Sequence, residues 1–167
     1  MWKWNNISNR IYNGKLVFEG EYLNSKRNGK GKEYYDNGNL KFEGEYLIDY
    51  KIKGKCYIDQ KLEFEGEFRY DRKWNGKGYD ENGNITYELK DGNGKVKEYN
   101  DDGYLVFEGE YLNGQRNGKG KEYNDKGIIN YYGEYLDGQR WNGLGINRYD
   151  YITDILEYIN GSKNIVY

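Results

Sequence analysis

Few side chains in this sequence could do chemistry, and the candidates do not form a complete catalytic set. The chain has no histidine and a single cysteine, Cys56, so histidine-based triads and most zinc sites are excluded. Cys56 aligns with a glycine of the related segments described below, which indicates a packing role and not a nucleophile. Glutamate pairs spaced Glu-x-Glu recur and could bind a cation, but nearby lysines are expected to pair with them on a solvated face.

Two segments resemble ligand-binding loops only in part. Residues 114–119 (GQRNGK) resemble a phosphate-binding loop. The segment is one residue too short, however, and Gly120 replaces the serine or threonine that would bind magnesium. Residues 80–84 (DENGN) resemble a calcium loop, but the glycine is at the fourth position instead of the sixth. Catalysis requires an acid, base or nucleophile in a dry pocket. We therefore predict that the protein is not an enzyme and has no cofactor and no metal site.

The elements that position these side chains are repeats. The segment FEGEYLNSKRNGKGKEYYD begins at Phe18 and recurs almost unchanged as FEGEYLNGQRNGKGKEYND at Phe107. A spacing of 20 to 24 residues separates successive copies of an aromatic-Glu-Gly-Glu-aromatic core or its relic. The copies begin at Phe18, Phe42, Phe64, Tyr87, Phe107 and Tyr131. Such a period is typical of an array in which each small unit packs on its neighbours.

Each repeat is expected to form a β-hairpin. Two short runs, such as residues 18–23 and 29–34, are bounded by Asn-Gly and acidic-x-Gly turn signals. A helix is disfavoured because the 24 glycines recur too often and no 3.6-residue apolar period is maintained. We therefore predict an all-β protein built from about six consecutive β-hairpins.

Alternation along each strand sorts the side chains onto two faces. One face carries two rows of rings with glycine between them, and the glycine is expected to leave room for the ring of a neighbouring unit. The other face carries glutamates and lysines that would pair across strands. Strict alternation also places Tyr34 and Tyr123 on the lysine face, so either a bulge resets the alternation or tyrosine covers both faces. The aromatic face is one candidate binding surface, formed by Phe18, Tyr22, Phe42, Tyr46, Phe64, Phe68, Phe107, Tyr111, Tyr131 and Tyr135.

Composition narrows the class of protein further. The formal net charge is −2, and a nucleic-acid-binding protein usually has a strong basic excess, so no nucleic acid is expected as a partner. No apolar run approaches the length of a membrane span, and the first ten residues (MWKWNNISNR) lack the apolar core of a secretion signal. With a single cysteine, no internal disulfide can form. These features predict a cytoplasmic protein.

The ends of an array expose edge strands and require caps. We expect an N-terminal cap in residues 1–17, hairpin repeats in residues 18–150 and a C-terminal cap in residues 151–167. Trp2 and Trp4 would cover the first hairpin or anchor the chain in a membrane. Ile152, Ile155, Leu156 and Ile159 follow a helical spacing, so we predict a short capping helix from Tyr151 to Ile159. The same residues also permit a degenerate hairpin.

The repeated segments resemble the MORN repeat (membrane occupation and recognition nexus). The pattern of that family is matched in order by residues 107–111 (FEGEY), 113–114 (NG), 118–120 (GKG) and 125–127 (DKG). The resemblance extends over about residues 18–145 and implies one elongated, twisted and open antiparallel sheet. It also implies membrane association, especially with phosphoinositides, or protein–protein contact and scaffolding, and self-association in many members.

The repeats depart from this pattern in two places. In the second unit, Ile48-Asp49-Tyr50 stands where Asn-Gly is expected. The fourth unit (TYELKDGNGKVKEYN) has lost the middle of its first strand and most of its loop. Such lapses either bend the array, mark a contact site or reflect drift in a tolerant surface loop.

Two functions are compatible with this sequence. The first is a non-catalytic module for protein interaction or scaffolding, such as an inhibitor or immunity-type binder, since tyrosine offers a large contact area at low entropic cost. The alternative is a peripheral membrane module that binds anionic phospholipid headgroups. Its candidate residues are bases that recur on one loop rim: Lys26, Arg27, Arg72, Lys73, Arg116 and Arg140.

Overall fold

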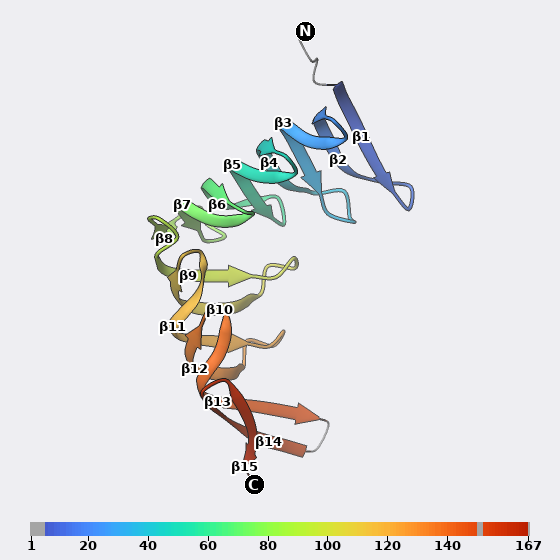
Figure 1. The fold of residues 1–167 in the computed structure, drawn as a ribbon. Coiled ribbons are helices and arrows are strands. Elements are labelled where there is room, and N and C mark those ends of the chain that lie inside the picture. Colours follow the sequence, from blue (N-terminus) through green and yellow to red (C-terminus); the bar gives the residue numbers. More distant parts are fainter. Residues whose placement is uncertain (1–5, 150–151, 167) are drawn as a thin grey trace. The chain divides into compact units, whose positions relative to one another are not determined.

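The computed structural model describes residues 6–149 and 152–166, and all regular structure in these ranges is β-strand (Figure 1). Fifteen strands pair with their neighbours in chain order to form two open antiparallel sheets. The array of consecutive hairpins predicted from the sequence is therefore confirmed, but it consists of two sheets where one was expected. The described residues contain no helix with the length and hydropathy needed to span a bilayer.

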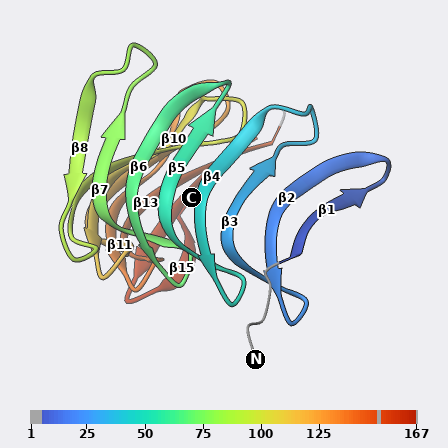
Figure 2. The same cartoon turned by 90° about the horizontal axis from the view of Figure 1, so that it is seen from above.

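The chain forms two compact units, and the division falls between Thr86 and Tyr87. The strands of the eight-stranded sheet are β1 (Asn6–Tyr12), β2 (Lys15–Leu23), β3 (Lys26–Tyr34), β4 (Leu40–Leu47), β5 (Tyr50–Ile58), β6 (Lys61–Arg69), β7 (Arg72–Tyr79) and β8 (Ile85–Leu89). Figure 2 shows that its strands are strongly curved.

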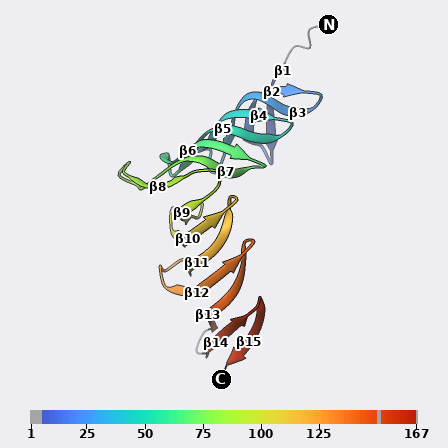
Figure 3. The same cartoon turned by 60° about the vertical axis from the view of Figure 1, so that its left-hand side comes forward.

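The strands of the seven-stranded sheet also follow one another in chain order (Figure 3). They are β9 (Gly94–Tyr99), β10 (Leu105–Leu112), β11 (Gln115–Tyr123), β12 (Ile129–Leu136), β13 (Gln139–Tyr149), β14 (Ile152–Ile159) and β15 (Ser162–Val166).

The degenerate fourth repeat coincides with the break between the sheets. Its strand β8 has only five residues, and β9 has six. Among the described residues, the chain links these two strands by a turn with one isolated bridge, between Lys90 and Asn93. The ladder of the eight-stranded sheet ends at β8, and that of the seven-stranded sheet begins at β9.

A row of glycines crosses each sheet at the middle of its strands. Successive strands pair Gly20, Gly31, Gly44, Gly54, Gly66 and Gly76 in one sheet and Gly109, Gly120, Gly133 and Gly143 in the other. A Cβ atom on Gly44 would lie 2.2 Å from the Lys53 carbonyl oxygen and 2.6 Å from Cζ of Phe42. The backbones therefore approach too closely for any side chain.

The ring that covers these glycines differs from the sequence-based expectation. Cζ of Phe42 approaches Gly44 and also Gly54, which is the partner glycine in the same hairpin. A ring of the neighbouring hairpin, as the sequence predicted, also approaches some of these glycines. At Gly120, Cε2 of Tyr135 would lie 3.0 Å from an added Cβ. Each hairpin thus folds over its own first aromatic residue.

The C-terminal capping helix predicted for residues 151–159 is wrong. Tyr151 lies outside the described residues, and β14 extends from Ile152 to Ile159 and pairs with both β13 and β15. The degenerate hairpin is the correct alternative. Ile155 and Leu156 have opposite environments, with Leu156 buried and Ile155 half exposed, which a strand produces and a shared helical stripe does not. Trp2 and Trp4 also lie outside the described residues.

Candidate functional site

The aromatic face, which the sequence offered as a binding surface, forms the core of each unit. Its first-row rings are almost fully buried, and so are most of the second-row rings; Tyr22 and Tyr111 are half-buried. Phe18, Phe42 and Tyr131 each meet two rings edge-on, as Phe42 does with Tyr46 at 5.4 Å and Phe68 at 5.6 Å between centroids. Phe107 meets Tyr135 edge-on and Tyr111 at a tilt. Edge-to-face pairs at this spacing are favourable. These rings hold neighbouring hairpins together and are not available to a partner.

A row of cations lies over these rings. In five hairpins the residue that pairs with the second aromatic position is a base, and its charge lies 4.2–5.6 Å from the centroid of the first-row ring. These residues are Arg27, Lys51, Lys73, Arg116 and Arg140. A cation at this distance is attracted to the face of the ring, and its alkyl stem shields the ring from water.

Carboxylates bridge these cations. Arg116 donates to Glu98 at 2.9 and 2.7 Å and to Glu122 at 3.0 Å. Glu122 also accepts from Arg140 and, at 2.9 Å, from the Tyr135 hydroxyl. In the first unit, Glu33 accepts from Arg27 and lies 2.7 Å from Nζ of Lys51. The result is a chain of ion pairs that closes the aromatic core.

The charges in this row of ion pairs favour the ionised form of the carboxylates. Burial by itself would raise the pKa of Glu122, but Arg140, the Tyr135 hydroxyl and Arg116 outweigh it and lower the pKa below its ordinary value. The pKa of Glu33 is lowered in the same way, since Lys51 and Arg27 outweigh burial. Both groups therefore stabilise the fold as anions.

Cys56 pairs with Phe42, the first aromatic residue of its hairpin. The equivalent position is glycine in the third and sixth repeats (Gly78 and Gly145), as the sequence alignment expected, but glutamate in the first and fifth (Glu33 and Glu122). The missing carboxylate is supplied by Glu63, a buried residue at the β-bulge of the next strand, which accepts from Lys73 at 2.5 and 2.6 Å. Burial raises the pKa of the Cys56 thiol to about 11, which suppresses the thiolate.

The six bases that the sequence placed on one rim therefore differ in their exposure. Lys26 and Arg72 are exposed. The other four bases, Arg27, Lys73, Arg116 and Arg140, are half-buried over the rings and paired with carboxylates. A positive charge that is already neutralised contributes little to the attraction of an anionic surface.

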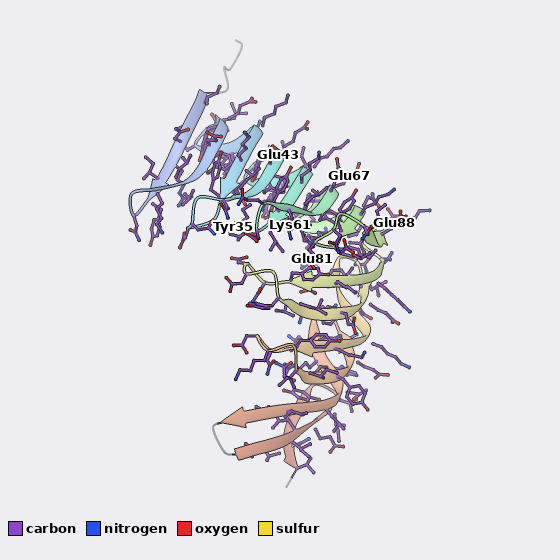
Figure 4. All side chains as sticks on the ribbon, turned by 180° about the vertical axis from the view of Figure 1, so that it is seen from behind. Tyr35, Glu43, Lys61, Glu67, Glu81 and Glu88 are labelled. Atoms are coloured by element: carbon purple, nitrogen blue, oxygen red, sulfur yellow. The ribbon has the colours of Figure 1, made fainter. Side chains whose placement is uncertain are left out.

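The opposite face carries the expected ladder of glutamates and lysines. Glu43 pairs with Lys32 on one side and Lys55 on the other. Figure 4 shows Glu43 and Glu67 on this face, whereas Tyr35, Lys61 and Glu81 lie at the rim of the sheet. In the first unit, the ion pair between Lys32 and Glu19 on this face is long, at 3.9 Å, and exposed, whereas Lys121 and Glu108 in the second unit are 3.1 Å apart. Exposed pairs of this kind contribute roughly 0–1 kcal/mol each.

The ambiguous tyrosines also lie on this face. The hydroxyls of Tyr34, Tyr57 and Tyr123 donate to Glu19, Glu43 and Glu108 at 2.5, 2.6 and 2.7 Å. Tyrosine therefore covers both faces, although a register shift is also present beside Tyr34. Burial and the bond to Glu19 raise the pKa of Tyr34 to about 12, so it remains a hydrogen-bond donor at neutral pH.

A groove runs across this second face in the first unit. Its volume is about 630 Å³, and four neighbouring strands, β2 to β5, and Ile7 of β1 line it. The floor is the glycine row, represented by Gly20, Gly31 and Gly44. The walls are four glutamates and four lysines: Glu19, Glu21, Glu43, Glu45, Lys30, Lys32, Lys53 and Lys55. We call this the Glu/Lys groove.

The bridging carboxylates Glu33, Glu98 and Glu122 were not predicted from the sequence. Their position could have been found from the sequence. Glu33 is two residues from Gly31 on the same strand, so its side chain lies on the same face as the glycine row and the aromatic rings. The groove was not predicted either, since it is lined by four neighbouring strands whose register the sequence pattern did not give. Among the described residues, no cluster of acidic or cysteine side chains could hold a metal ion.

Comparison with known proteins identifies two of the hairpins. Residues 18–40 and 107–128 match the family model of the MORN repeat, so the chain contains MORN repeats at these two places. The matched segments begin at the buried rings Phe18 and Phe107 and include the cations Arg27 and Arg116. MORN repeats are interaction or membrane-associated modules that generally lack enzymatic activity. No curated protein matches the chain.

Proposed function

We propose that this chain is a non-catalytic binding module that recognises another protein, either as a scaffold or as an inhibitor or immunity-type binder in the cytoplasm. The Glu/Lys groove is the observation that supports this most directly, because it is a long depression on the face that the core does not use. A groove whose floor is backbone and whose walls alternate in charge suits an extended polypeptide with charges of both signs.

The weakness of the exposed ion pairs favours such a ligand. Lys32 and Glu19 are 3.9 Å apart, and Lys55 and Glu65 are 3.8 Å apart. Exchanging these long pairs for pairs with a ligand costs little, and complementary charge mainly gives specificity and a fast association rate.

The alternative is binding to anionic phospholipid headgroups, as the MORN repeat suggests. It receives less support here, because four of the six rim bases are paired with carboxylates over the aromatic core. Self-association is a further prediction, since β1 and β15 are the open edges of their sheets.

Capture from cells that make the chain tests the protein-binding function. The captured protein is purified and titrated against wild type, a Lys30→Glu/Lys53→Glu groove variant and a Lys126→Glu control in an exposed turn. We expect the groove variant to weaken binding at least about tenfold and the control to leave it unchanged.

Vesicle flotation provides the opposing test. Vesicles containing a phosphoinositide are mixed with the chain at low salt, where electrostatic attraction is strongest. We expect the chain to remain unbound. Flotation that depends on the phosphoinositide, together with failure to capture a protein, would establish the lipid alternative instead.

A further inference from the structure

The tight turns that follow the even-numbered strands all place their first residue in the left-handed backbone region. These residues are Asn24, Ile48, Tyr70, Asp91, Asn113, Asp137 and Asn160, with φ between 49° and 53°. Asparagine and aspartate tolerate this conformation and are the usual choice in two-residue hairpin turns. Ile48 and Tyr70 are the exceptions, and both lie in the first unit.

Isoleucine and tyrosine are unsuited to this backbone conformation. A β-branched side chain at positive φ is a genuine outlier, and Ile48 has φ 50°. Such strain persists when another requirement holds the residue in place, and it is concentrated at functional sites. The equivalent turn of the second unit uses Asn113 and Gly114, which relieve the strain without loss of the hairpin.

Packing within the protein does not account for these residues. Ile48 is 51% exposed and Tyr70 is 69% exposed. The Tyr70 ring meets the exposed ring of Tyr50 edge-on at 5.7 Å between centroids, which links the two turns across the rim. Leu47 and Ile52, which are also exposed, flank the turn between β4 and β5. We call Leu47, Ile48, Tyr50, Ile52 and Tyr70 the turn ridge.

Arg69 carries a positive charge beside the turn ridge, whereas the two turn aspartates are engaged by backbone amides. Oδ1 of Asp49 accepts from the Arg27 amide, and Oδ1 of Asp71 accepts from the Lys51 amide, each at 2.9 Å. Both turn aspartates are therefore directed back to the preceding hairpin. Arg69 is exposed and lies over the rings of Tyr70 and Trp74, at 6.0 and 4.9 Å from their centroids.

We propose that the turn ridge is a docking surface for a partner protein that presents an apolar recess bordered by carboxylates. The exposed apolar side chains would fill the recess, and the guanidinium of Arg69 would face the acidic border. Aromatic and arginine side chains at the centre of an interface are the residues that most often dominate binding energy. This proposal rests on the protein-binding function proposed above and adds the rim as a second contact beside the groove.

The test replaces strained apolar residues by the residue that the turn favours. In the Ile48→Asn/Tyr70→Asn variant we expect the melting temperature to rise, since the strain is relieved, while the affinity for the captured partner falls at least about tenfold. Ile85→Asn is the matched control, because Ile85 is also 51% exposed but lies at the opposite rim, after the turn that precedes β8. Its partner affinity should equal that of the wild type. Raising the salt concentration should weaken wild-type binding, as expected for acidic groups facing Arg69.

Each outcome decides between the two proposals. If the chain binds a protein whose affinity the double variant retains, the turn-ridge proposal is overturned and the protein-binding function stands. If no protein is captured, both proposals fail. If sedimentation shows that the wild type is a dimer and the double variant a monomer, the ridge is a self-association surface and the proposed partner is wrong.

Discussion

At the scale of single residues, Arg116 shows how a polar chain closes an aromatic core. Its guanidinium binds two oxygens of Glu98, reaches Glu122 and lies 4.2 Å from the centroid of the Phe107 ring. A planar guanidinium satisfies these contacts at once, and an ammonium group cannot. Lys51 and Lys73 occupy the same position in other hairpins, where each pairs with one glutamate.

Substitution of Arg116 by lysine is expected to be destabilising. We predict that Arg116→Lys lowers the free energy of unfolding by about 1–2 kcal/mol, because the two-oxygen contact with Glu98 is lost while the charge remains. Urea unfolding measures this difference. Lys119→Arg, on the opposite face, is the control and should change stability by less than about 0.5 kcal/mol. Equal stability of Arg116→Lys and the wild type would show that charge alone matters.

The ion-pair chain also predicts a pH dependence. The pKa of Glu122 is lowered in the folded state, so its stabilising contribution is present above its ordinary pKa of 4.5 and is lost as pH falls through the lower, folded value. We expect Glu122→Gln to cost about 1–2 kcal/mol at pH 7, a range that allows for partial exposure, and to flatten the loss of stability below pH 4.5. Glu134→Gln, an exposed position, should retain the wild-type acid profile. A Glu122→Gln profile identical to the wild type would contradict the proposed role of this carboxylate.

Residue alternation predicted the two faces correctly, but it could not rank them by burial. Phe18 and Tyr22 were placed together, and they do share a face. Arg27 was assigned to an accessible rim because sequence spacing does not show that a loop base folds back over a ring 5.6 Å away. Cys56 aligns with a glycine of the third and sixth repeats but with a glutamate of the first and fifth, because hairpins differ by one residue between the cation and the glycine row, which only the strand register reveals.

At the scale of elements, the paired glycines determine the shape of each hairpin. We predict that Gly44→Ala destabilises the protein by at least about 3 kcal/mol, because its Cβ would meet the Lys53 carbonyl at 2.2 Å. Gly38→Ala is an informative comparison, since Gly38 has φ +86° and no atom within 4 Å of the added Cβ. Backbone strain alone should then cost about 1–2 kcal/mol. Thermal unfolding of both variants would show whether space or backbone conformation dominates, and a smaller loss in Gly44→Ala would contradict the packing described here.

The C-terminal element shows the limit of periodicity as evidence. Residues 152–159 satisfy a helical spacing and a strand alternation, and the ladder with β13 decides between them. We predict that Leu156→Ala costs about 2–3 kcal/mol, because Leu156 is buried, whereas Ile155→Ala costs less than about 1 kcal/mol. Similar losses in urea unfolding for both variants would favour a shared apolar stripe and would contradict the strand.

At the scale of the whole molecule, the chain builds its core without a large apolar content. Rings from adjacent hairpins alternate along each unit, and Phe18, Phe42, Phe107 and Tyr131 each contact a ring of the next hairpin. Such an array leaves one face and both rims open, which suits binding along its length. The repeat period was sufficient to predict this architecture, whereas the division into two sheets depends on the residues missing from the fourth repeat.

The accessibility of individual tyrosines tests the central claim, that the aromatic face is core and the opposite face and rims are surface. Nitration of the folded chain by tetranitromethane, mapped by mass spectrometry, reports which tyrosines are accessible. We predict fast nitration of Tyr12, Tyr70 and Tyr104, which are exposed, and protection of Tyr46, Tyr131 and Tyr135, which are buried and have raised pKa values. Nitration of the second group at the rate of the first, in a chain that remains folded, would contradict the account.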